Sequence, residues 1–229
     1  MSARHALKLS GPRVAVAPGA TGADPRPGAL RLDALTATTI TEAVAGLDAW
    51  LDSMRQPGGY GGPVSHWWWD CLSYTGPGLD WRYEGIIIGY LNLWAATGDP
   101  GWLHKAKRAA DDLVAGQLPS GHFRNSAFEL NPGTSGTPHE AACDLALLRL
   151  ALALRAAGAS DWRLYCQAAE RNLRAYFLER LWDERRGYFR DDPDVDCFVP
   201  NKSATVAEAL FAFASLTGET GWAEHHALL

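Results

Sequence analysis

The sequence is poor in cysteine. Cys71, Cys143, Cys166 and Cys197 are the four cysteines in 229 residues, and none forms a C-x-x-C pair. This low density excludes a small disulfide-stapled scaffold and gives no zinc or thioredoxin-type motif. We therefore predict thiols that are buried or incidental. No H-E-x-x-H spacing occurs either, so we expect no bound metal and no cofactor.

Long apolar runs are also lacking. Residues 1–33 contain no apolar core of the kind found in a secretory signal. The longest apolar segment, residues 145–157, is interrupted by Arg149 and Arg155. A membrane-spanning helix needs about 18 or more apolar residues. We therefore expect no membrane association and a cytoplasmic location.

Positive charge is not in excess. The chain has 21 Lys and Arg against 26 Asp and Glu, for a formal net charge of −5, and it has no basic run. Such a balance gives no general attraction to nucleic acid. G-x-S-x-G, P-loop and dinucleotide-binding motifs are absent as well. We expect no nucleic-acid partner.

What the chain does contain is a series of helical patterns. Residues 1–33 are rich in Gly, Pro and Ala and are predicted to form an irregular N-terminal arm. The remainder, residues 34–229, is predicted to be one helical domain. Apolar periodicity and Gly/Pro breaks predict helices over residues 35–54, 81–97, 102–117, 138–157, 161–182 and 201–216, with a seventh beginning at 221.

The helices repeat in pairs. Trp102, Trp162 and Trp222 are each 60 residues apart and follow similar Gly-containing turns. A second echo joins Gly59-Tyr60, Gly121-His122-Phe123 and Gly187-Tyr188-Phe189. A fixed period with similar punctuation indicates one supersecondary unit used about three times. The unit is an inner helix, a short turn, an outer helix and a long loop.

The two helix types differ in polarity. The segments near residues 81–97, 138–157 and 201–216 are apolar nearly all round, whereas 102–117 and 161–182 are amphipathic. Apolar helices wrapped by amphipathic ones are typical of an α/α toroid. An open helical solenoid has the same local pattern. The weak repeat identity and the long loops at one end favour an all-α fold, an α/α toroid of helical hairpins that forms a partial or small barrel.

The segment Val199–Trp222, VPNKSATVAEALFAFASLTGETGW, resembles inner-helix segments of the six-hairpin glycosidase-like (α/α)6 barrels. That superfamily includes glycoside hydrolases and the N-acylglucosamine and cellobiose 2-epimerases. The resemblance covers residues 35–229 and implies a small-molecule carbohydrate as substrate. A full barrel has twelve helices, and the chain shows about half of them. It is therefore expected to be a fragment, a smaller toroid or one copy of a homo-oligomer.

In such barrels the loops that enter the inner helices form the substrate cleft. The loop segment His66–Asp70 includes three consecutive tryptophans, Trp67, Trp68 and Trp69, followed by Asp70. Indoles stack well on sugar rings, so these residues are predicted to bind substrate. Packing of the loop onto the barrel rim is an equally good explanation.

The first turns of the inner helices carry the candidate acids and bases. Glu84 and Glu140 are predicted to be catalytic because glycoside hydrolysis needs two carboxyl groups. His139 is a candidate general base for epimerisation. The alternative is that these carboxylates complement helix dipoles. Tyr83, Arg124 and Asn201 are predicted to contact substrate, although Asn201 is also a good helix N-cap.

Asp144 is unusual within an apolar helix. A buried carboxylate needs a partner, and we expect Arg149 or a group on another inner helix to supply it. Taken together, these features predict a carbohydrate-active enzyme with hydrolase-like acid/base chemistry. The alternatives are a sugar 2-epimerase or isomerase of the same fold, and a non-catalytic scaffold that binds a glycan or a protein.

Overall fold

The computed structural model describes residues 37–65, 72–75, 77–123, 138–191, 194, 196–219 and 221. The chain divides into two compact units, Met1–Leu47 and Asp48–Leu229. The predicted arm over residues 1–33 lies outside the described residues, as does the continuation of the seventh helix after 221. The helices are α1 (Ala37–Ser53), α2 (Arg82–Thr97), α3 (Pro100–Gly116), α4 (Pro138–Ala156), α5 (Trp162–Asn172), the π-helix η3 (Leu173–Leu181) and α6 (Pro200–Thr217).

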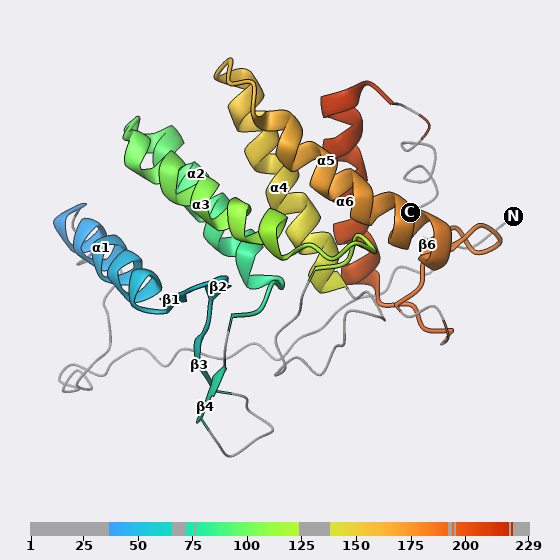
Figure 1. Cartoon of the computed structure of the whole chain (residues 1–229), viewed down its shortest axis with the longest axis horizontal. Helices are drawn as coiled ribbons and strands as arrows, with labels where there is room; N and C mark the ends of the chain where they lie inside the picture. The colour runs from blue at the N-terminus through green and yellow to red at the C-terminus, as the bar shows by residue number, and fades with distance from the viewer. Residues whose placement is uncertain are drawn as a thin grey trace, which may run out of the picture. The chain divides into compact units, whose positions relative to one another are not determined.

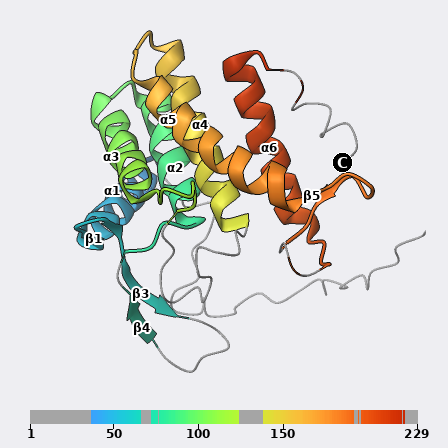
Figure 2. The same cartoon turned by 45° about the vertical axis from the view of Figure 1, so that its right-hand side comes forward.

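The helices of the second unit pack in two layers, which can be followed in Figures 1 and 2. Helix α4 contacts α2 on one side and α6 on the other, and α3 and α5 form the second layer. Residues 140–148 of α4 are all buried. Helices α3 and α5 instead bury one stripe each and expose charged residues. The predicted burial of an inner helix on nearly all faces is seen in α4, whereas α2 and α6 each keep an exposed face, and Phe211 on α6 is 64% exposed.

Left-handed glycines end the three inner helices. Gly98, Gly158 and Gly218 have φ angles of 72°, 76° and 79°. This conformation carries little cost in glycine, and it ends a helix while satisfying its last carbonyls. The glycines are 60 residues apart, like the tryptophans four positions later. The repeat seen in the sequence is therefore a repeat of helix ends.

Short hairpins follow the outer helices. The strands are β1 (Arg55–Gln56), β2 (Gly59–Tyr60), β3 (Gly62–Ser65), β4 (Leu72–Thr75), β5 (Trp182–Asp183) and β6 (Tyr188–Phe189). Strand β1 pairs with β2, β3 with β4 and β5 with β6, all antiparallel. A single bridge, Gln117 to Phe123, takes the hairpin's place after α3. The β1–β2 and β5–β6 hairpins and the Gln117–Phe123 bridge contain the Gly-aromatic echo of the sequence. Strands of two to four residues gave no signal in the sequence.

Several predicted helix details were wrong. The first helix, predicted over residues 35–54, is described as α1 over Ala37–Ser53. Asn201 lies in the first turn of α6, while Val199 occupies the capping position without a side-chain capping bond. The segment predicted as one helix over 161–182 widens into η3 after Asn172. Among the described residues, no helix is long and apolar enough to cross a membrane.

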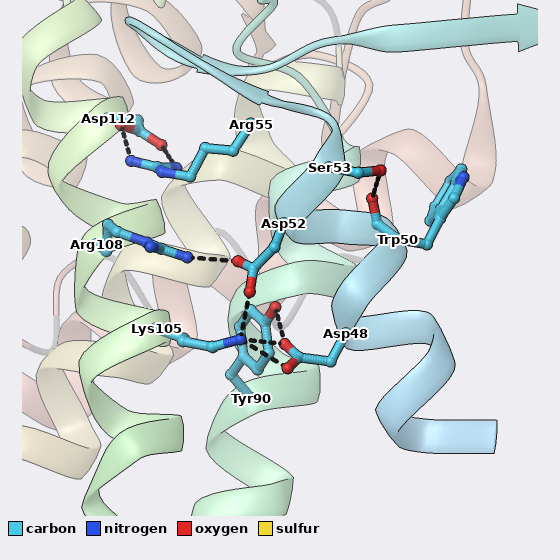
Figure 3. A network of polar contacts seen from close by, with 9 residues as sticks. All are labelled: Asp48, Trp50, Asp52, Ser53, Arg55, Tyr90, Lys105, Arg108 and Asp112. Carbon is cyan, nitrogen blue, oxygen red and sulfur yellow. Dashed lines mark hydrogen bonds and ion pairs between the residues drawn. The ribbon is translucent and has the colours of Figure 1, made fainter. Parts of the chain in front are cut away.

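Ion pairs join the end of α1 to α3 within the second unit (Figure 3). Lys105 Nζ bridges the carboxylates of Asp48 and Asp52 at 2.5 Å and 2.8 Å. Arg55 donates two hydrogen bonds to Asp112, 2.5 Å and 2.8 Å long, in a bidentate pair. Bidentate guanidinium–carboxylate pairs fix geometry as well as charge. Arg55 and Asp112 thereby hold the first hairpin against α3.

Candidate functional site

A buried histidine–carboxylate pair lies at the N-terminal end of α4. His122 Nδ1 lies 2.8 Å from Oε2 and 3.1 Å from Oε1 of Glu140. Glu140 has no exposed surface, while His122 retains 6% exposure. A carboxylate only accepts hydrogen bonds, so with Glu140 as the acceptor the donor of this pair is Nδ1–H of His122. In the neutral imidazole this tautomer leaves a lone pair on Nε2.

Asn172 completes the surroundings of Glu140. Its Nδ2 donates to Glu140 Oε2 at 2.9 Å and to the carbonyl oxygen of Gly121 at 3.1 Å. Two acceptors on one nitrogen fix the orientation of the amide. Its Oδ1 is buried and has no hydrogen-bond partner among the described residues. The network therefore joins the loop after α3, the start of α4 and the end of α5.

The π-helix η3 begins immediately after Asn172. Its Tyr176 packs edge-on against His122, with ring centroids 4.5 Å apart. Segments of π-helix are rare and occur frequently at functional sites. Asn172, the last residue of α5, contacts the carboxylate, and Tyr176, in η3, contacts the imidazole of the same pair.

A second carboxyl lies one helical turn further along α4. Asp144 is fully buried, and neither of its oxygens has a hydrogen-bond partner among the described residues. Burial first, and then the charge of Glu140, raises the pKa of Asp144 well above its usual range. The expected partner, Arg149, binds Glu208 instead, at 2.5 Å. That expectation was wrong because residues 144 and 149 are five positions apart and point in different directions on the helix.

Asp80 lies just before α2, and Tyr83 lies in its first turn. The Asp80 carboxylate accepts from the backbone N–H of Arg82 at 3.0 Å and pairs with its guanidinium at 2.5 Å. The Tyr83 hydroxyl accepts from the N–H of Tyr60 at 3.0 Å and donates to Asp112 at 3.3 Å. Tyr83 has no exposed surface. These contacts give Tyr83 a structural part, and its predicted contact with substrate stays a prediction.

Glu84 has different neighbours from Glu140. Its side chain is partly buried. Burial and the charge of Glu208 raise the pKa of Glu84, and Arg149 acts in the opposite sense. Glu140 interacts with His122 and Asn172 instead. The two carboxylates that the sequence suggested as a pair are therefore associated with different charged groups.

The remaining predicted site residues lie partly within and partly outside the described residues. Asn201 is exposed on the first turn of α6. His139 lies in α4, but its side chain is not among those described. Among the described residues, no cluster of three or more His, Cys, Asp or Glu side chains is arranged to hold a metal ion. Trp67, Trp68, Trp69, Asp70 and Arg124 lie outside the described residues, so their roles stay predictions.

His122 was missed by the sequence reasoning. The signal was present in the Gly-aromatic echo, where His122 occupies the place of Tyr188 in the third unit. His122 is a titratable ring at a position where the third unit has the tyrosine Tyr188. Such a replacement differs from the repeated Gly-aromatic pattern. Asn172 gave no such signal, because its place depends on where the outer helix widens.

Comparisons with known proteins show a likeness to a solved structure. No protein-family model matches the sequence, and no curated protein matches it. The structure is similar to that of D-mannose isomerase. The TM-score is 0.55 at 16% sequence identity, over 84% of this chain and 50% of that chain. The chain thus spans about half the length of that protein.

At this identity the likeness concerns the fold. The described chain is mostly helical and resembles the helical-barrel fold of D-mannose isomerase. The predicted all-α architecture of helical hairpins is therefore confirmed.

Proposed function

We propose that the chain carries a catalytic site for the isomerisation or epimerisation of a small carbohydrate, with His122 as the general base. The observation that carries this proposal is the His122–Glu140–Asn172 network, buried at the N-terminal end of an inner helix. The fold likeness to D-mannose isomerase supports the substrate class.

The chemistry requires a base beside a carbonyl group. Aldose–ketose isomerisation and 2-epimerisation both begin with removal of the proton on the carbon next to the carbonyl. Histidine is suited to this step because its ordinary pKa lies near neutrality. Glu140 holds Nδ1–H, which selects the tautomer with a basic Nε2 and stabilises the imidazolium that forms. Glu140 thus acts as the positioning partner of the base.

Glycoside hydrolysis, the function that the sequence first suggested, needs two carboxyl groups on opposite sides of a glycosidic bond. Glu140 instead accepts hydrogen bonds from His122 and Asn172, and Glu84 lies among Glu208 and Arg149. This arrangement supports proton transfer at His122 in preference to hydrolysis by the Glu84–Glu140 pair.

Solvent exchange measures the proposed step directly. The purified chain is incubated in D2O with a panel of aldoses that includes D-mannose, and proton NMR follows loss of the C2 proton and formation of ketose or epimer. His122→Gln is expected to reduce exchange by about 10²–10⁴-fold, the usual contribution of a general base. His104→Gln is the matched control, because His104 is an exposed histidine on α3.

Two results would contradict the proposal. One is a folded His122→Gln variant that exchanges the C2 proton at the wild-type rate. The other is release of sugar from glycosides without any C2 exchange, which would return the site to the hydrolase hypothesis.

A further inference from the structure

Asp144, on α4, carries a fully buried carboxyl. Both of its oxygens are buried without a hydrogen bond among the described residues, on the same face of α4 as Glu140 and one turn away. A buried polar group without a partner destabilises the folded state. Such a group is commonly kept for a reason other than stability.

The repeat shows that the fold does not require this carboxyl. The residues 15 positions before the glycines that end the inner helices are Tyr83, Cys143 and Ser203. All three are buried. The next residue in each unit is Glu84, Asp144 or Ala204. The third inner helix has alanine at this position, so an inner helix of this fold forms without an acid there.

We propose that Asp144 is a catalytic residue of the isomerase site, whose neutral carboxyl donates a hydrogen bond to the carbonyl oxygen of the sugar and accepts one from the neighbouring hydroxyl. This inference rests on the function proposed above. A neutral carboxyl group offers one donor and one acceptor side by side, so it can contact two adjacent oxygens of a cis-enediol together. Neither Asp144 oxygen is engaged in another hydrogen bond among the described residues.

The proton balance of the reaction suits this role. In the first step His122 Nε2 takes the C2 proton, the C2–H electron pair forms the C1–C2 double bond, and O1 receives the Asp144 proton. In the second step the Asp144 carboxylate takes the proton of O2, a C2–O2 double bond forms, and C1 takes the proton from His122. Both residues return to their starting states, so the isomerisation needs no further reactant.

Burial supports the neutral form that the first step needs. Desolvation and the nearby Glu140 raise the pKa of Asp144 well above its usual range. A carboxylic acid kept neutral in an apolar site is an effective donor to a developing oxyanion. Asp144 has no exposed surface, so a sugar reaches it only if the first turns of α4 move locally on binding.

Two substitutions at this position separate catalysis from folding. Asp144→Asn keeps one donor and one acceptor but has no proton to transfer, so kcat is expected to fall by about 10²–10⁴-fold with KM nearly unchanged. Asp144→Leu removes both contacts, and it is expected to lower kcat and raise KM while the protein remains folded. Glu170→Gln, on the partly exposed outer helix α5, is the carboxylate control. The substrate is the aldose that exchanges fastest with the wild type.

The outcomes separate this inference from the proposed function. If the wild type exchanges no C2 proton with any aldose, the proposed function fails and the role of Asp144 fails with it. If the wild type is active and either folded variant keeps the wild-type kcat, only the role of Asp144 is refuted. A fall in kcat for folded Asp144→Asn without a change in KM supports the inference.

Discussion

The pH dependence of stability gives a test of Asp144 that needs no substrate. In the folded protein, burial favours the protonated carboxyl, because neither oxygen has a described partner and Glu140 lies close by. In the unfolded chain the same group ionises near its ordinary pKa of about 3.9. The substitution Asp144→Asn keeps the shape of the side chain and removes its titration.

The sign follows from the raised pKa. An acid whose folded-state pKa lies above its unfolded value contributes full stability below the unfolded pKa, and it loses that contribution as the pH rises toward the folded pKa. The wild type should therefore weaken relative to Asp144→Asn by about 1.4 kcal/mol per pH unit above roughly pH 4. The difference levels off at the folded-state pKa, so the plateau measures that pKa.

Urea unfolding of both proteins at half-unit steps between about pH 4 and pH 8 provides the assay, and Glu170→Gln serves as the control with an accessible carboxylate. Glu140 is the charged neighbour acting on Asp144 among the described residues, so the experiment is repeated in Glu140→Gln to separate its influence. A constant difference between wild type and Asp144→Asn across this range would show that Asp144 ionises normally, and it would refute the reasoning.

Two further predictions concern the frame around the site. Asp112→Ala should destabilise the protein by about 2–3 kcal/mol, because it removes the bidentate partner of Arg55 and the acceptor of the buried Tyr83 hydroxyl. A double-mutant cycle with Arg55→Ala measures the coupling energy between Arg55 and Asp112. If the two substitutions change the unfolding free energy additively, the pair does not stabilise the protein. Gly121→Ala should cost about 1–3 kcal/mol, since Gly121 has a φ of 92° and an added Cβ would lie 3.0 Å from the Arg171 carbonyl oxygen. Gly121→Ala should also displace His122 and slow C2 exchange. Unchanged stability in thermal unfolding, or unchanged C2 exchange by NMR, would contradict this prediction.

Much of the fold was predictable because it depends on local signals. The inner helices end at Gly98, Gly158 and Gly218, which adopt a left-handed conformation that glycine accepts readily. The helices themselves are predicted by the apolar segments that precede these glycines. Helix α4 was placed within a residue at each end because Pro138 and Gly158 bound it. The hairpins were missed because pairing of two-residue strands depends on contacts with the helices beneath them.

The site was less predictable because its contacts are long-range. Glu140 was identified as a candidate, but its partners His122 and Asn172 are 18 and 32 residues away in the chain. Asn172 contacts Glu140 directly before η3, and residue propensities do not predict a π-helix. The sequence also aligned Glu84 with Glu140, since each lies near the start of an inner helix. The register counted from the terminal glycines instead aligns Glu84 with Asp144.

The repeat therefore separates structure from chemistry. Positions that play the same part in each unit serve the fold, as the three terminal glycines and the buried hairpin residues Tyr60, Phe123 and Phe189 do. His122 departs from the third unit, where Tyr188 stands in its place, whereas the register of Asp144 carries Glu84 in the first unit and Ala204 in the third. His122 and Asp144 belong to the same unit, and His122 contacts Glu140 one turn before Asp144 on α4. A fold maintained by repetition does not by itself produce, in one unit, a buried histidine, a hydrogen-bonded carboxylate and a buried carboxyl that has no partner among the described residues. Their coincidence is the reason for placing the reaction at this unit.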